Sequence, residues 1–192
     1  MTETGEPSPG TRSGFVALIG APNAGKSTLL NQLVGAKVSI VTHKVQTTRA
    51  LVRGIATRDR TQIVFVDTPG IFKPRRRLDR AMVTTAWGGA KDADVVAFLL
   101  DAERGISGDA ETILDNLSEV RQPKILILNK VDRIKRDKLL VLAAEANERV
   151  SFERTFMISA LTGDGCDDLL GYLAEALPEG PWYYPEDQIS DL

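Results

Sequence analysis

The sequence predicts a three-layer α/β domain, with a six-stranded, mostly parallel sheet that has one antiparallel strand and helices on both faces. Short apolar runs alternate with stretches of helical periodicity, such as 15–20 followed by 26–35. Such alternation is typical of strands joined by crossover helices. The runs 50–56 and 62–66 are separated only by the charged turn TRDR, which indicates the antiparallel pair.

The rest of the chain continues the alternation. Continuous apolar runs are typical of strands buried on both faces, and apolar residues three or four positions apart are typical of amphipathic helices. The remaining predicted elements are strand 95–102, helix 109–120, strand 124–130, helix 138–150, strand 154–160 and helix 167–177.

Composition and length indicate a soluble globular protein. The chain has 192 residues, enough for one full hydrophobic core, and its net charge of −2 argues against a general attraction to nucleic acid or anionic lipid. A single cysteine, Cys166, excludes an intrachain disulfide and fits a reducing compartment. No apolar run has the length of a membrane span. We expect a cytoplasmic monomer, and a peripheral contact with the inner face of the cell membrane is left open.

The two ends of the chain differ in composition from the middle. Residues 1–13 are polar and rich in Gly, Pro, Ser and Thr, which predicts a disordered tail. The predicted α/β domain occupies residues 14–178. Residues 179–192 combine prolines and aromatic residues and end in PEDQISDL, whose proline and acids suit the first turn of a helix. We interpret 179–192 as a linker toward a further domain.

A phosphate-binding loop is predicted at GAPNAGKS, residues 20–27, which fits G-x-x-x-x-G-K-[ST] between a buried strand and a helix. Glycines let the backbone bend so that successive N–H groups face an anion. Lys26 would contact the β- and γ-phosphates, and the Ser27 hydroxyl would bind Mg²⁺. The alternative is a chance glycine turn, which the strand–loop–helix context argues against.

A second element of such a site follows the strand 62–66. Asp67 ends this strand and could hold Mg²⁺ through a water molecule. Gly70 could offer its backbone N–H to the γ-phosphate, because no side chain blocks close approach. The D-x-x-G pattern is weak alone and gains force from the upstream phosphate loop.

The tetrapeptide NKVD, residues 129–132, indicates guanine as the base. The Asp132 carboxylate can accept both N1–H and the exocyclic amine of guanine, whereas adenine has no N1–H, so an ATPase is disfavoured. Lys130 would lay its stem along the base, and Asn129 would brace the loops. In SAL, residues 159–161, the Ala160 N–H could reach guanine O6.

A nucleotide-sensing segment is predicted at residues 38–50, where a hydroxyl of Thr47 or Thr48 could complete the Mg²⁺ shell. A plain surface loop is the alternative. Ile71 raises a difficulty, because it stands where many related enzymes place a polar side chain that orients the attacking water.

Together these motifs resemble the TrmE–Era–EngA class of translation-associated P-loop GTPases, and within it the Era family. The features that carry the resemblance are the segments AGKSTLLNQLVG (24–35), QTTR (46–49), DTPGIFKP (67–74) and YPEDQISDL (184–192). QTTR, in place of a G-T-T-R-D form, argues against the tRNA-modification and double-domain relatives. The resemblance covers residues 14–192 and implies a GTPase that acts in maturation of the small ribosomal subunit.

The resemblance also implies an answer to Ile71. In this class a hydrophobic residue occupies that position, and K⁺ supplies positive charge at the phosphates. Asn23 matches the asparagine that binds this ion, with backbone carbonyls around 42–47 as further ligands. Era proteins carry a C-terminal KH domain that binds small-subunit ribosomal RNA, and residues 179–192 would lead to it. The implied partners are guanine nucleotide and, for the longer protein, the small subunit with its rRNA.

The candidate residues form three overlapping sets. Those expected to contact GTP or GDP are Gly20, Ala21, Pro22, Asn23, Ala24, Gly25, Lys26, Ser27, Thr28, Asp67, Thr68, Pro69, Gly70, Ile71, Asn129, Lys130, Val131, Asp132, Ser159, Ala160 and Leu161. The candidate catalytic residues are Asn23, Lys26, Thr48 and Gly70. The candidate metal ligands are Ser27, Thr48 and Asp67 for Mg²⁺ and Asn23 for K⁺.

Two alternatives to a GTP-hydrolysing, K⁺-assisted switch are left open. Ile71 is compatible with a module that holds nucleotide with negligible turnover, although such a module would not need Asn23 as a cation ligand. The chain could also be the GTPase domain of another member of the class, acting in tRNA modification or large-subunit assembly.

Overall fold

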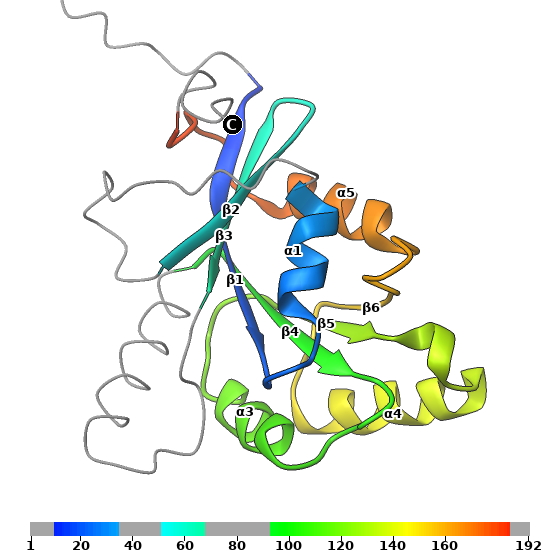
Figure 1. Ribbon diagram of the computed structural model, residues 1–192. Helices are drawn as coiled ribbons and strands as arrows, with labels where there is room; N and C mark the ends of the chain where they lie inside the picture. The colour runs from blue at the N-terminus through cyan, green and yellow to red at the C-terminus, as the bar shows by residue number, and fades with distance from the viewer. Residues whose placement is uncertain (1–9, 35–50, 68–92, 185–192) are drawn as a thin grey trace, which may run out of the picture.

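The computed structural model describes residues 10–34, 51–67 and 93–184 (Figure 1). Its elements in chain order are β1 (Arg12–Gly20), α1 (Lys26–Val34), β2 (Leu51–Arg58), β3 (Thr61–Asp67), β4 (Val95–Asp101), α3 (Asp109–Leu117), β5 (Lys124–Asn129), the 3₁₀ turn η1 (Val131–Arg133), α4 (Arg136–Arg149), β6 (Arg154–Met157) and α5 (Cys166–Ala176).

The six strands form one sheet in the order β2-β3-β1-β4-β5-β6. β1 pairs in parallel with β3 and β4, and β4, β5 and β6 continue the parallel pairing. Only β2 runs antiparallel, against β3, and Asp59 in their connecting turn has a φ of 52°. The predicted mostly parallel sheet with one antiparallel strand is confirmed.

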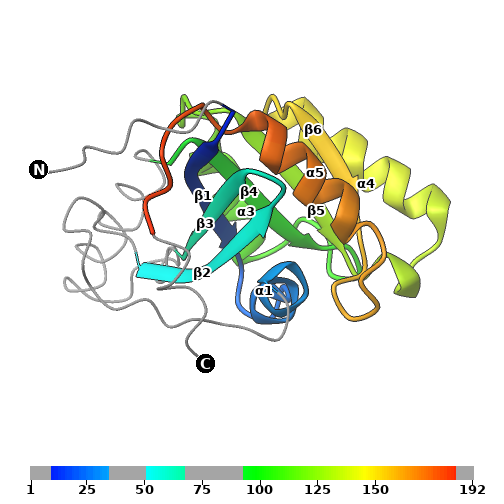
Figure 2. The ribbon, with the colours of Figure 1, turned by 90° about the horizontal axis from the view of Figure 1, so that it is seen from above.

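Both faces of the sheet are buried, and β1 shows why. Its side chains alternate, so Phe15, Ala17 and Ile19 join the core on one face while Val16 and Leu18 join the core on the other. Helices α3 and α4 cover the first face, and α1 and α5 cover the second (Figure 2). A strand covered on both faces needs apolar residues at every position, which explains the continuous runs in the sequence.

Residues near the two predicted domain boundaries contact each other in the structure. β1 begins at Arg12, so two residues assigned to the tail belong to the sheet. The Gly180 N–H donates to the Thr11 carbonyl over 3.1 Å, and the Arg12 guanidinium donates to the Leu177 carbonyl over 2.9 Å. Backbone pairing between segments far apart in sequence therefore ties residues 177–180 to the start of β1, an interaction that local composition does not reveal.

The predicted element ends are otherwise shifted by a few residues. One such shift is in β6, which stops at Met157 although a strand was predicted to residue 160. The chain turns after Ile158, and the Ser159 N–H donates to the Asp164 carbonyl over 3.0 Å. Within the described ranges, no helix combines the length and the apolar composition needed to cross a bilayer.

Candidate nucleotide-binding site

The carboxyl ends of the parallel strands gather the predicted motifs at one edge of the sheet. Gly20 at the end of β1 pairs with Leu99 of β4, and Asp101 at the end of β4 pairs with Asn129 at the end of β5. Parallel strands bring their carboxyl ends to the same edge, where ligands of open α/β sheets bind. The segments 20–28, 129–132 and 159–161, predicted from separate motifs, therefore meet at this edge.

The predicted phosphate loop leaves β1 and enters α1 through a tight turn. The Ala24 N–H donates to the Ala21 carbonyl over 3.2 Å, and the first helical bond runs from the Leu29 N–H to the Gly25 carbonyl over 2.9 Å. Asn23 and Gly25 both have positive φ, 66° and 102°. The loop thereby places the N-terminus of α1, which favours an anion, at the edge of the sheet.

Gly25 is required by close packing as well as by its backbone conformation. A Cβ at this position would lie 2.4 Å from the Asn129 amide nitrogen, which is too close for two non-bonded heavy atoms. The glycine thus leaves space for the Asn129 side chain beneath the phosphate loop. A glycine is therefore needed here both for the turn and for the contact between the phosphate loop and the segment that carries Asn129.

Asn129 joins three segments of the chain. It is 2% exposed, its amide nitrogen donates to the Ala24 carbonyl over 2.9 Å, and its amide oxygen accepts the Ala160 N–H over 2.9 Å. The expected bracing role agrees with these contacts. In the structure the Ala160 N–H donates to Asn129, and its expected contact with guanine O6 stays a prediction. The bond to Asn129 helps to position the loop 159–161 behind the site.

Lys130 connects the NKVD segment to the phosphate loop through its ammonium group. The residue has a φ of 65°, and its Nζ lies 2.8 Å from the Asp101 carboxylate and donates to the Asn23 carbonyl over 3.3 Å. The two oxygens fix the end of the side chain. The lysine stem, predicted to lie along the base, is therefore anchored at its tip by β4 and by the phosphate loop.

Asp101 is a site residue that the sequence analysis missed. Its side chain is 7% exposed and also accepts N–H bonds from Glu103 and Arg104 over 2.9 and 3.2 Å. Burial alone would raise the pKa of Asp101, but the Lys130 ammonium and these N–H donors together hold it below the usual value. The sequence did contain a signal for this residue: Asp101 is an acid at the end of the apolar run of β4, just as Asp67 is an acid at the end of the apolar run of β3.

The residues expected to recognise the base differ in their exposure. Asp132 is an exposed member of η1, and the Val131 N–H holds this turn against the sheet by donating to the Ile158 carbonyl over 3.3 Å. Ser159 is buried, whereas Leu161 is 72% exposed. The Asp132 carboxylate is thus open to a ligand while the backbone that carries it is fixed.

The predicted metal ligands are described only in part. Ser27, the second residue of α1, is exposed, and so is the αL residue Asn23. Asp67 ends β3 in register with Leu18 of β1. Predicted residues that lie outside the described ranges are Thr48, Thr68, Pro69, Gly70 and Ile71, together with most of the segment 38–50.

Two hollows border the described part of the chain. A cavity of about 260 Å³ separates the phosphate loop from the start of α3 and is lined by Pro22, Asn23 and Asp101 among others. A larger hollow lies at β6 and contains none of the predicted nucleotide-binding residues. The smaller hollow therefore borders the predicted site at residues 21–24 of the phosphate loop, and the residues predicted to recognise the base do not line it.

Known proteins match this chain both in sequence and in structure. Residues 15–130 match the family model described as 50S ribosome-binding GTPase. The GTPase Era of Mesorhizobium japonicum is 78% identical over 190 residues, which cover 99% of this chain and 61% of that protein. The GTPase Era of Sinorhizobium medicae is 78% identical over 95% of this chain and 59% of its own length. The chain thus spans about 60% of the length of these relatives.

Two solved structures are 39% identical to the chain in sequence and superpose on it with a TM-score of 0.77, and each match covers 95% of this chain. One is an Aquifex aeolicus Era variant bound to GDP and AlF₄⁻, and the other is Era in complex with MgGDPNP and nucleotides 1506–1542 of 16S ribosomal RNA. The chain covers 62% of each. The G domain of the T. maritima FeoB iron transporter, at 23% identity and a TM-score of 0.60, shares the fold.

Proposed function

The chain belongs to the 50S ribosome-binding GTPase family, in its Era branch, and from this premise we propose that it binds guanine nucleotide and hydrolyses GTP to GDP and phosphate. One observation carries the proposal. The buried Asn129 side chain bonds the phosphate loop through Ala24 and the loop after β6 through Ala160, directly beside Asp132. Motifs for phosphate and for guanine are therefore held together by one side chain.

Base selection follows from the Asp132 carboxylate. It accepts the N1–H and the exocyclic amine of guanine, and adenine would leave it without a matching donor, which discriminates by about 10⁴-fold or more. The anchored tip of Lys130 limits how the NKVD turn can move, because its ammonium binds both Asp101 and the Asn23 carbonyl. Base and phosphate subsites thus keep one relative position.

Phosphate binding is assigned to the loop 20–27 and to Lys26. The N-terminus of α1 favours negative charge, and its Ser27 hydroxyl is exposed where a Mg²⁺ ligand would be needed. Bound Mg²⁺ would neutralise charge on the β- and γ-phosphates. We assign Ser27, Thr48 and Asp67 to this ion. In the reaction a water oxygen forms a bond to the γ-phosphorus, while the bond between that phosphorus and the β–γ bridging oxygen breaks.

Potassium is proposed to replace the missing water-orienting side chain at Ile71. Asn23 fits the assignment, since its exposed amide stands on a left-handed turn of the phosphate loop. The alternative, a module that binds nucleotide without turnover, draws on Ile71 alone. GTP hydrolysis at saturating Mg²⁺ in potassium and in sodium buffer separates the two, with Asn23→Ala alongside.

Faster turnover in potassium that is lost in Asn23→Ala supports the cation assignment. Equal, near-background rates in both salts would contradict it for this chain, and retained GDP binding would then favour the binding module. If the unmodified chain fails to bind GDP, the proposal as a whole is contradicted.

For the longer protein we propose a role in maturation of the small ribosomal subunit. The similar Era structure was solved with nucleotides of 16S ribosomal RNA, and the curated relatives extend well beyond this chain. The family description names the 50S subunit, whereas the similar Era structure contains 16S ribosomal RNA, and we favour the small subunit because that structure is of an Era protein. We further propose that the protein is a cytoplasmic monomer that can contact the inner face of the cell membrane peripherally.

A further inference from the structure

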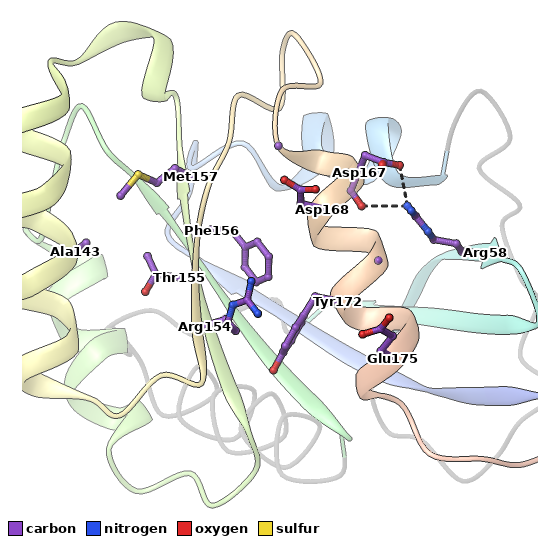
Figure 3. Close-up of a pocket in the computed structure, with 12 residues that line it drawn as sticks. Arg58, Ala143, Arg154, Thr155, Phe156, Met157, Asp167, Asp168, Tyr172 and Glu175 are labelled. Atoms are coloured by element: carbon purple, nitrogen blue, oxygen red, sulfur yellow. Dashed lines mark hydrogen bonds and ion pairs between the residues drawn. The ribbon is translucent and has the colours of Figure 1, made fainter.

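A groove of about 730 Å³ runs along β6 between α4 and α5 (Figure 3). β6 is the last strand in the sheet order, and among the described strands only β5 pairs with it. An edge strand presents backbone N–H and C=O groups that can pair with an added strand. The groove therefore combines an open sheet edge with a hollow large enough for side chains of a second chain.

Arg154 lies at the centre of this groove. Its guanidinium is 5.6 Å from the ring centroid of Phe156 and 5.5 Å from that of Tyr172, and the two rings are 5.4 Å apart. Within the described residues, this guanidinium makes no hydrogen bond or ion pair. The aromatic rings thus hold the cation in place while its N–H donors stay available for carbonyl oxygens of an occupant.

The α5 wall of the groove carries carboxylates. Asp167 is already paired with Arg58 over 2.8 Å, whereas Asp168 and Glu175 are exposed and have no ion-pair partner among the described residues. Figure 3 shows Asp168 and Glu175 along α5, on the side that faces β6. Two unpaired carboxylates favour a positively charged side chain at this wall and disfavour a phosphate backbone.

We propose that this groove binds an extended, basic peptide segment of a partner protein. The segment adds to the sheet as a strand beside β6, a recurring mode of peptide recognition. Its carbonyl groups accept N–H bonds from Arg154, and its lysine or arginine side chains contact Asp168 and Glu175. The site lies apart from the nucleotide residues, so peptide binding does not depend on the proposed GTPase activity.

The probe is a short fluorescent peptide of alternating valine and lysine, compared with an alternating valine and glutamate peptide and a single-stranded oligoribonucleotide. Fluorescence anisotropy with the chain measures binding, and ¹⁵N NMR shifts of residues 154–157 locate it. We expect the lysine peptide alone to bind and to shift these amides. Binding of the oligoribonucleotide in preference, or no binding by any probe, would overturn the proposal.

Gly171→Leu tests the groove itself. A Cβ at Gly171 would meet only the Arg58 guanidinium, at 3.6 Å, which is an ordinary van der Waals contact, and leucine is a better helix former than glycine. We expect at least a tenfold loss of peptide affinity with no loss of thermal stability. The matched control is Ala144→Leu, which adds the same side chain at an exposed site of α4.

Charge reversal tests the carboxylates. Asp168→Lys with Glu175→Lys should weaken the lysine peptide about tenfold or more, and Glu119→Lys, an exposed acid beyond α3, should leave its affinity unchanged. Equal losses in the groove and control variants would show a general charge effect and would overturn the assignment of this groove.

Discussion

Two buried amides at opposite ends of the sheet perform related tasks with different consequences. At the carboxyl end, Asn129 bonds two separate segments through Ala24 and Ala160. At the amino end, Gln62 is fully buried and bonds a single residue twice. Its amide nitrogen donates to the Tyr184 carbonyl over 2.7 Å, and its amide oxygen accepts the Tyr184 N–H over 3.1 Å.

The difference separates a ligand site from a structural attachment. Asn129 determines the relative position of loops that carry different parts of the predicted nucleotide site, so its geometry bears on function. The Gln62 side chain pairs with the backbone of Tyr184 as a neighbouring strand would. The adjacent Tyr183 packs its ring against that of Phe15, with the ring centroids 4.7 Å apart. Gln62 fixes the position of Tyr184, 122 residues later in sequence.

The largest effect of a substitution is expected at the carboxyl end of the sheet, where Asn129 lies. Asn129→Ala removes a donor from the Ala24 carbonyl and an acceptor from the Ala160 N–H, and each buried group left unpaired costs about 1–3 kcal/mol. We expect GDP affinity to fall by about 100-fold, together with a loss of stability. Titration with a fluorescent GDP analogue and urea unfolding measure the two effects. A GDP affinity within threefold of the unmodified chain would contradict the bracing role.

A smaller effect is expected at the Asp101–Lys130 pair. Asp101→Asn keeps the shape but removes the charge that anchors Lys130, and we expect GDP affinity to fall by about tenfold. Fluorescent GDP titration measures it, and Glu103→Gln, which alters an exposed pair with Arg133, serves as the control. An equal change in both variants would contradict the anchoring role.

The same pair gives a pH dependence with a definite sign. Because the pKa of Asp101 is lowered in the folded state, its stabilising contribution is present above the unfolded pKa of about 3.9 and is lost as pH falls through the folded value. The free energy of unfolding, measured with urea at a series of pH values, should therefore be similar for the unmodified chain and for Asp101→Asn in acid. Above about pH 4 the unmodified chain should be the more stable of the two. A stability difference that grows on acidification would contradict this assignment.

The smallest effect on nucleotide is expected at the amino end. Gln62→Ala leaves both backbone groups of Tyr184 without this partner, so we expect a stability loss of about 1–3 kcal/mol and GDP affinity unchanged within twofold. Urea unfolding and GDP titration on one preparation give both values. A large loss of GDP affinity would show that the two ends are coupled, and the separation drawn above would fail.

The sequence predicted the layers of the fold because strand burial leaves a direct trace in it. Continuous apolar runs such as that of β4 favour strands covered on both faces, and the short charged turn between two such runs indicates a hairpin. The strand order did not follow, since it depends on which crossovers pass over which face. The attachment of residues 177–184 was missed for the same reason, because its partners in β1 and β3 are distant in sequence.

Within the candidate site, motifs predicted the residues and the structure supplied their contacts. Asn129 was expected to brace loops because its motif places it there. Asp101 belongs to no motif that the sequence analysis used, and its role depends on the register that sets it beside Asn129 across β4 and β5. The bond from the Ala160 N–H to the Asn129 oxygen was not predicted, since sequence cannot show that the two lie within hydrogen-bond distance.

The central claim, that the carboxyl-end loops form a guanine-specific site, is tested most directly by changing the base preference. Asp132→Asn should disfavour guanine and favour xanthine, whose C2 carbonyl can accept the new amide N–H while N1–H still has an acceptor. The measurement is displacement of a fluorescent nucleotide by GDP, xanthosine diphosphate and ADP. We predict that the unmodified chain prefers GDP and that Asp132→Asn prefers xanthosine diphosphate. An unchanged preference in Asp132→Asn would contradict the account.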